Sequence, residues 1–145
     1  MAAGSVMAID LGTVRIGVAV SDGLRMGANP LEMIPAKHEE AVFDRLLELS
    51  AEHEVVEFVV GLPLNMDGTE SPGSTRARQF AEKLSAVTGK PAHLWDERLS
   101  SWAAENALIE GGVRREKRKK YVDKVAAAYI LQSYLDAHDK NPPLA

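Results

Sequence analysis

Short apolar blocks dominate the first third of the chain and predict β-strands. Residues 6–11 read VMAIDL and residues 16–21 read IGVAVS, and turn residues follow each block. Apolar blocks of this length bounded by turns are typical of buried strands, so the pattern predicts a β-hairpin. A third strand is expected at 29–34, where Pro30 and Pro35 favour a sheet edge because proline cannot donate a ladder hydrogen bond.

The rest of the chain alternates between helical and strand patterns. Residues 55–60 form a nearly continuous apolar run, as expected for a parallel strand covered on both faces. Gly, Pro, Asn and Ser are frequent at 61–74, which predicts a long connection, and connections of that length are often functional. The other predicted elements are helices at 39–54, 74–87, 100–109 and 121–137 and a strand at 92–95.

This order predicts one α/β domain over residues 1–140, followed by a frayed tail at 141–145. Meandering strands followed by alternating helices and strands give a mixed sheet with helices on its faces. The 145 residues contain no cysteine, which excludes disulfides, thiolate zinc sites and cysteine nucleophiles. We find no signal segment and no apolar run near the roughly 18 residues of a membrane span. We therefore expect a cytoplasmic enzyme or binding module with no membrane partner.

Acidic residues stand where the predicted elements would otherwise be apolar. Asp10 closes the first strand, Asp96 and Glu97 close the last, and the carboxyl ends of parallel strands meet at one sheet edge. Alternation sends Asp96 and Glu97 to opposite faces, and the pattern leaves open which one faces Asp10. Asp123 falls on the apolar stripe of the last helix, where a helix-terminal acid favoured by the dipole is the alternative. Buried carboxylates need compensation, usually from a divalent cation, so metal-dependent phosphate chemistry is the leading hypothesis.

Positive charge is concentrated in one segment. The formal net charge is −4, yet residues 114–120 read RREKRKK. Such a segment attracts a polyanion locally, because salt screens the rest of an acidic protein beyond about 8 Å. A solvated surface loop is the alternative interpretation. The position of the run, just before Asp123, favours a contact with nucleic acid.

Four motifs follow one another in a fixed order. They are AIDLGTVRIGVAVSD at 8–22, VVGLPLNMDGTE at 59–70, DERLSS at 96–101 and RREKRKKYVDKVAAAYILQ at 114–132. Together they resemble the YqgF family, also called RuvX, which comprises bacterial proteins with a ribonuclease H-like fold related to the RuvC resolvase of Holliday junctions. The resemblance covers nearly the whole chain. It implies a five-stranded mixed sheet with an antiparallel second strand, flanked by helices.

The resemblance also implies an activity and a site. Asp10, Glu97 and Asp123 match the acidic triad proposed for the family, which selects Glu97 over its neighbour. The family is described as a nuclease for the 5′ end of precursor 16S ribosomal RNA, with Holliday-junction resolution as the older proposal. We therefore expect a Mg²⁺- or Mn²⁺-dependent hydrolase of phosphodiester bonds. Its expected partners are pre-rRNA, within the precursor of the small ribosomal subunit, or branched DNA.

Basic residues near the triad are the predicted nucleic-acid contacts, and an unpaired surface position is the alternative for the arginines. Val14 departs from the family pattern, because many relatives carry a basic residue there. Trp95 and Trp102 could stack on bases, although core packing is favoured for aromatic residues with apolar neighbours. Arg78 is a further candidate for a contact with the substrate backbone. The predicted contacts are Arg15, Arg76, Arg98, Lys117, Arg118 and Lys120.

Two other classes of function fit parts of the sequence. DLGTVRIGVAV also resembles the first phosphate loop of the actin, Hsp70 and sugar-kinase ATPases, but 145 residues supply neither a second lobe nor a second phosphate loop. A non-catalytic nucleic-acid or ribosome-binding module would use the basic segment and keep the acids only for folding or weak metal binding. The oligomeric state is open between a monomer and a weak homodimer, and a resolvase would need a two-fold dimer.

Overall fold

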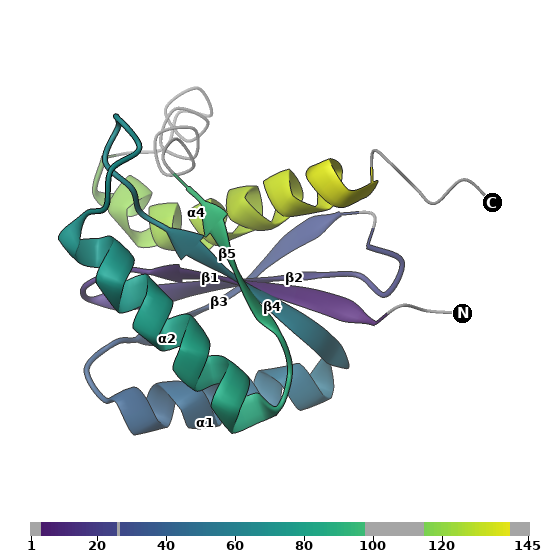
Figure 1. Cartoon of the computed structure of the whole chain (residues 1–145). Helices are drawn as coiled ribbons and strands as arrows, with labels where there is room; N and C mark the ends of the chain where they lie inside the picture. The colour runs from purple at the N-terminus through teal and green to yellow at the C-terminus, as the bar shows by residue number, and fades with distance from the viewer. Residues whose placement is uncertain (1–3, 26, 98–114, 140–145) are drawn as a thin grey trace.

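A five-stranded sheet organises the chain (Figure 1). The computed structural model describes residues 4–25, 27–97 and 115–139, and in the last range the side chains of 125–138. The strands lie in the order β3-β2-β1-β4-β5. Their bounds are Ser5–Leu11 for β1, Arg15–Ser21 for β2, Ala28–Pro35 for β3, Val55–Leu62 for β4 and Ala92–Asp96 for β5.

The second strand runs against both of its neighbours. β2 pairs antiparallel with β1 and β3, whereas β1 pairs parallel with β4, and β4 pairs parallel with β5. The predicted mixed sheet with an antiparallel second strand is therefore confirmed. β3 contains Pro30 and Pro35 and lies at the edge of the sheet, as predicted from the missing proline N–H.

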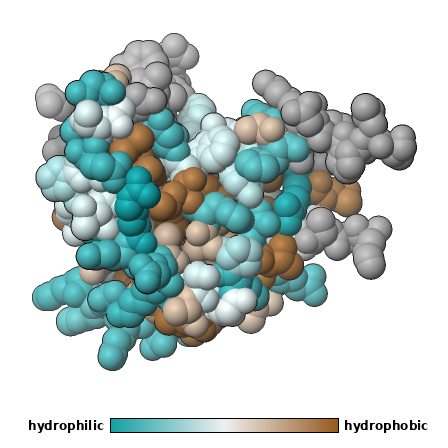
Figure 2. Space-filling view, viewed as in Figure 1, coloured by the Kyte–Doolittle hydropathy of each residue, from teal (hydrophilic) through white to brown (hydrophobic). Residues whose placement is uncertain are grey.

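Helices cover both faces of this sheet. Helices α1 (Glu39–Glu52) and α2 (Pro72–Thr88) lie on one face, and α4 (Arg115–Asp139) crosses the other (Figure 1). The outer surface near α1 and α2, at the lower left of Figure 2, is largely hydrophilic. Within the described ranges, no helix has both the length and the apolar character to cross a bilayer.

Several element boundaries differ from the sequence prediction. α2 begins at Pro72 rather than at 74, because Ser71 caps it and proline suits the first helical position. α4 begins at Arg115 rather than at 121, so residues 115–120 of the basic segment form the first turns of a helix and not a loop. Arg, Lys and Glu are good helix formers, which accounts for this difference. The helix predicted at 100–109, Trp102 and the tail at 141–145 lie outside the described residues.

Alternation along the strands divides the buried side chains into two layers. In β1, Met7 and Ile9 belong to the layer under α1 and α2, whereas Val6 and Ala8 belong to the layer under α4. Successive side chains of a strand point to opposite faces. The next residue, Asp10, therefore points to the α4 face.

The layer under α1 supplies a test of core packing. Leu46 is 0% exposed, whereas its neighbour Leu47 is 38% exposed. We expect Leu46→Ala to lower the free energy of unfolding by about 2–5 kcal/mol, because truncation leaves a cavity in the core. Leu47→Ala removes the same atoms from the surface and should cost much less. Urea denaturation measures both costs, and equal values would contradict the packing of α1 described here.

Candidate active site

Asp10 and Glu97 bring two carboxyl groups together at the edge of the sheet. Asp10 lies near the carboxyl end of β1 and is 6% exposed. Glu97 directly follows β5, and its backbone N–H donates to the carbonyl oxygen of Leu62 at the end of β4 over 3.2 Å. The Asp10 carboxyl lies close enough to that of Glu97 to raise the pKa of Glu97. Both acids are therefore held by strand ends, where their positions are well defined.

The alternation of β5 distinguishes Glu97 from Asp96. Leu94 packs with the layer under α1 and α2, whereas Trp95 packs with the layer under α4. Glu97 is thus on the α4 face together with Asp10, and Asp96 is on the opposite face, where it is exposed. The sequence pattern alone left these two residues undecided, and the structure places Glu97 beside Asp10.

Glycines flank Asp10 on both neighbouring strands. Asp10 is opposite Gly17 of β2, and the parallel register of β1 and β4 places Gly61 beside Asp10 on the other side. A Cβ atom at Gly61 would lie 2.2 Å from Oε2 of Glu97, so the Glu97 carboxyl lies directly over β4. This contact was not predicted, because a glycine in a strand does not indicate which side chain lies over it.

Burial and the neighbouring acids disfavour the ionised form of Glu97. Burial, followed by the charge of Asp10, a hydrogen bond with Asp10 and the charge of Asp96, raises the pKa of Glu97 to about 9. Oε2 of Glu97 is buried and has no hydrogen-bond partner in the described part of the chain. An unsatisfied carboxylate oxygen beside a second acid suits a divalent cation. The cation binds carboxylate oxygens and neutralises the repulsion between the two acids. The residues present therefore fit the metal expected from the sequence.

Asp123 belongs to α4, but its side chain lies outside the description. Its position precedes the buried Ala127 by one helical turn and the buried Ile130 by two. Helix α4 begins on the side of the molecule where β1 and β4 end (Figure 1). Among the described side chains no group of three metal-binding residues occurs. The structure thus brings two members of the predicted triad together and places the third on the helix that covers them.

The predicted basic contacts have different surroundings. Arg76 donates from Nη1 to the carbonyl oxygen of Gly12 over 2.9 Å, so it binds the turn that follows Asp10. Arg78 pairs with Glu70 over 2.8 Å, which contradicts the interpretation of an unpaired surface arginine. Arg15 begins β2 and is half-buried. Arg98 lies outside the described residues, as do the side chains of Lys117, Arg118 and Lys120.

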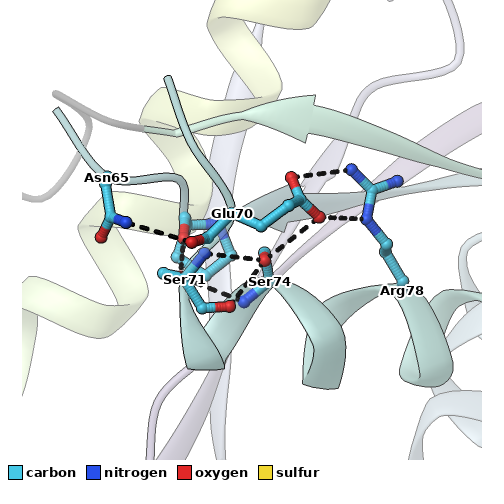
Figure 3. A network of polar contacts seen from close by, with 6 residues as sticks. Asn65, Glu70, Ser71, Ser74 and Arg78 are labelled. Carbon is cyan, nitrogen blue, oxygen red and sulfur yellow. Dashed lines mark hydrogen bonds and ion pairs between the residues drawn. The ribbon is translucent and has the colours of Figure 1, made fainter. Parts of the chain in front are cut away.

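A hydrogen-bond network fixes the connection that leaves β4 at this edge (Figure 3). Nδ2 of Asn65 donates to the carbonyl oxygen of Glu70 over 3.0 Å, and the Glu70 carboxylate accepts from Arg78. Ser71 and Ser74 form a capping box, each side chain accepting a hydrogen bond from the backbone N–H of the other. The long connection predicted at 61–74 is therefore ordered by its own side chains.

The cap of α2 contributes to stability in a measurable way. The Ser71 hydroxyl accepts from the N–H of Ser74 and donates to the carbonyl oxygen of Pro63. We expect Ser71→Ala to lower the free energy of unfolding by about 1 kcal/mol, a typical value for a lost helix cap. Thr75→Ala, at an exposed position one turn further on, is the matched control. Thermal or urea unfolding of both variants measures the effect, and an unchanged Ser71→Ala variant would contradict it.

Trp95 is a packing residue in this structure. Its ring meets that of Tyr134 edge-on, with centroids 5.3 Å apart, and its Nε1 donates to Oγ of Ser133 over 3.0 Å. His93 and His138 belong to the same aromatic cluster. This arrangement supports the interpretation that favoured core packing over base stacking for Trp95.

Comparisons with known proteins find relatives over nearly the whole chain. The model of the RuvX family, described as a Holliday junction resolvase, matches residues 4–137. A protein of Myxococcus xanthus named "Putative pre-16S rRNA nuclease" is 47% identical over 137 residues, which cover 94% of this chain and 89% of the relative. A protein of the same name from Listeria monocytogenes is 47% identical over 133 residues, covering 90% of this chain and 96% of the relative.

A solved structure shares the fold. The RuvC protein of Thermus thermophilus, solved in complex with a Holliday junction substrate, superposes with a TM-score of 0.56 at 17% identity. The match covers 93% of this chain and 95% of RuvC. This likeness confirms the predicted ribonuclease H-like fold. The family match and the relatives, which are close to half identical over nearly the whole chain, show that this protein belongs to the RuvX family.

Proposed function

We propose that this protein is a metal-dependent nuclease that hydrolyses phosphodiester bonds in structured RNA, with the 5′ end of precursor 16S rRNA as its substrate. Family membership and the names of the relatives support a hydrolase of this class. The observation that carries the chemistry is the meeting of Asp10 and Glu97 over Gly61. Two adjacent acids with an unsatisfied buried oxygen are suited to bind a divalent cation.

Asp10, Glu97 and Asp123 would hold Mg²⁺ or Mn²⁺. When bound, the cation supplies Lewis acidity that activates water and neutralises charge developing on the phosphate. The chain contributes the rigid placement of its acids. Asp10 is fixed within β1, and the backbone of Glu97 is tied to Leu62. Preorganised groups of this kind need not rearrange during the reaction, which is their main advantage in catalysis.

The phosphate backbone of the substrate would be bound by basic residues around this edge. The basic segment, of which residues 115–120 belong to α4, would supply most of the positive charge, and Arg15 and Arg98 are close in sequence to Asp10 and Glu97. Such contacts position a nucleic acid without reading its bases. Binding should therefore weaken steeply with salt, because each neutralised phosphate releases a counterion.

Resolution of Holliday junctions is a second candidate function. The description of the family and the fold shared with RuvC favour it. Cutting two strands of a junction in a symmetric manner would need a two-fold dimer. The relatives named for pre-16S rRNA favour the first candidate, which we place in the cytoplasm on the precursor of the small ribosomal subunit, with the protein as a monomer or weak homodimer.

A side-by-side cleavage assay tests the proposal. The substrates are a 5′-extended precursor 16S rRNA and a four-way DNA junction, each incubated with Mg²⁺, Mn²⁺ or a chelator. We expect metal-dependent cleavage of the RNA near the mature 5′ end. Preferential cleavage of the junction would instead support the second candidate function, resolution of Holliday junctions. Salt-sensitive binding of RNA that survives loss of the acids, with no product at any metal concentration, would show a non-catalytic binding module.

A further inference from the structure

We propose that Gly61 is a positioning residue, whose missing side chain opens the space in which the Glu97 carboxyl meets Asp10 and a divalent cation is held. The inference rests on the metal site proposed above. It concerns a residue of β4 that carries no functional group, and therefore acts only through the acids beside it.

The strand order creates the need for an open position. Asp10 and Glu97 come from β1 and β5, which are separated by β4. Neighbouring strands lie about 4.8 Å apart, so the backbones of β1 and β5 are separated by roughly 10 Å. Gly61 pairs with Trp95 of β5 and lies beside Asp10 of β1. Any side chain at this position would stand on the sheet between the two acids.

The contacts around Gly61 show which groups would collide. A Cβ atom there would lie 2.2 Å from Oε2 and 2.9 Å from Cδ of Glu97, and 2.8 Å from Cδ1 of Ile130. All three distances are far below van der Waals contact, so the neighbours would have to move. The nearest atoms are side-chain ends and not backbone. The fold should therefore survive an alanine at this position, and the displaced group would be the Glu97 carboxyl.

The conformation of Gly61 offers no other reason for a glycine. The positive backbone φ angles of described glycines occur at Gly4, Gly68 and Gly89. Gly61 is therefore in an ordinary strand conformation that alanine adopts without strain. Glycine within a strand is intrinsically unfavourable and often marks the close approach of another group. Here that group is the Glu97 carboxyl.

Metal binding by Gly61→Ala tests the inference without relying on activity. Isothermal titration with Mn²⁺ is carried out on wild type, on Gly61→Ala and on Gly23→Ala, whose added Cβ would meet nothing within 4 Å. We expect Gly61→Ala to bind Mn²⁺ roughly 10- to 100-fold more weakly, as for other changes that disorient a metal ligand. Gly23→Ala should bind like wild type. Far-ultraviolet circular dichroism confirms that each variant is folded.

A double-mutant cycle shows whether Glu97 is the group displaced. Its four proteins all carry Ile130→Val, which removes the Cδ1 atom that would also contact the new methyl group. Without metal, Gly61→Ala should lower the melting temperature when Glu97 is present and leave it unchanged or raise it in a Glu97→Ala background. An equal effect in both backgrounds would overturn the inference, as would unchanged Mn²⁺ binding by Gly61→Ala. Failure of wild type itself to bind Mn²⁺ would instead refute the proposed metal site.

Discussion

Replacing Asp10 by asparagine is expected to slow phosphodiester cleavage by about 100- to 1,000-fold while the protein stays folded. The side chain keeps its size but loses the charge that would bind a divalent cation. Asp10 is 6% exposed and lies beside the Glu97 carboxyl, so its charge is a costly feature of the metal-free protein. Asp10→Asn should therefore be as stable as wild type or more stable without metal. Loss of activity together with retained stability is the signature of a functional acid.

Asp44→Asn is the matched control for this variant. Asp44 is an exposed carboxylate of α1, on the face of the sheet opposite to Asp10. Its loss should leave cleavage unchanged. Single-turnover cleavage of precursor rRNA at saturating Mg²⁺ measures both rates. Cleavage by Asp10→Asn at the wild-type rate would show that Asp10 takes no part in the reaction.

Replacing Glu97 by glutamine should remove the part of the pH dependence of stability that arises from Glu97. Because the pKa of Glu97 is raised to about 9 from 4.5, the folded protein holds this proton more tightly than the unfolded chain. The stabilising contribution is complete below about pH 4.5 and is lost as the pH rises through about 9. Metal-free wild type should therefore lose stability over this window. Glutamine cannot ionise, so Glu97→Gln should be more stable than wild type at pH 8 to 9, by roughly 1–3 kcal/mol after allowance for solvent screening.

Divalent metal should invert this order of stability. Mg²⁺ or Mn²⁺ would stabilise wild type, because a ligand that binds only the folded state raises its stability, and would stabilise Glu97→Gln much less. Urea denaturation from pH 5 to 9, with metal and with chelator, measures both effects. Glu82→Gln removes an exposed carboxyl group on α2 and is the control. If wild type and Glu97→Gln have parallel pH profiles in chelator, the burial of Glu97 beside Asp10 is wrong.

Much of the fold follows from local patterns in the sequence. Alternating and continuous apolar runs indicated the strands, and prolines at 30 and 35 indicated the edge position of β3, because each rule reflects a backbone hydrogen bond or a buried face. The start of α2 was missed by the pattern, since Pro72 reads as part of a loop until the cap formed by Ser71 is known. The last helix was predicted to begin at 121, whereas α4 begins at Arg115, because the charge of the basic segment hides a good helix propensity.

Only part of the candidate site could be predicted from the sequence. Asp10 was indicated by its charge at the end of an apolar strand. The choice of Glu97 over Asp96 needed either the family resemblance or the packing of Leu94 and Trp95, because alternation gives opposite faces without saying which is which. The role of Gly61 could not be predicted from the sequence. It depends on the strand order, which places β4 between β1 and β5 and the Glu97 carboxyl over Gly61.

The central claim is that the acids on the α4 face hold a divalent cation for phosphodiester hydrolysis. Anomalous scattering from crystals soaked in Mn²⁺ locates such an ion directly. We predict a peak within about 2.0–2.6 Å of carboxylate oxygens of both Asp10 and Glu97. A preparation that cleaves RNA yet shows no ion at these two carboxylates under saturating Mn²⁺ would contradict the account.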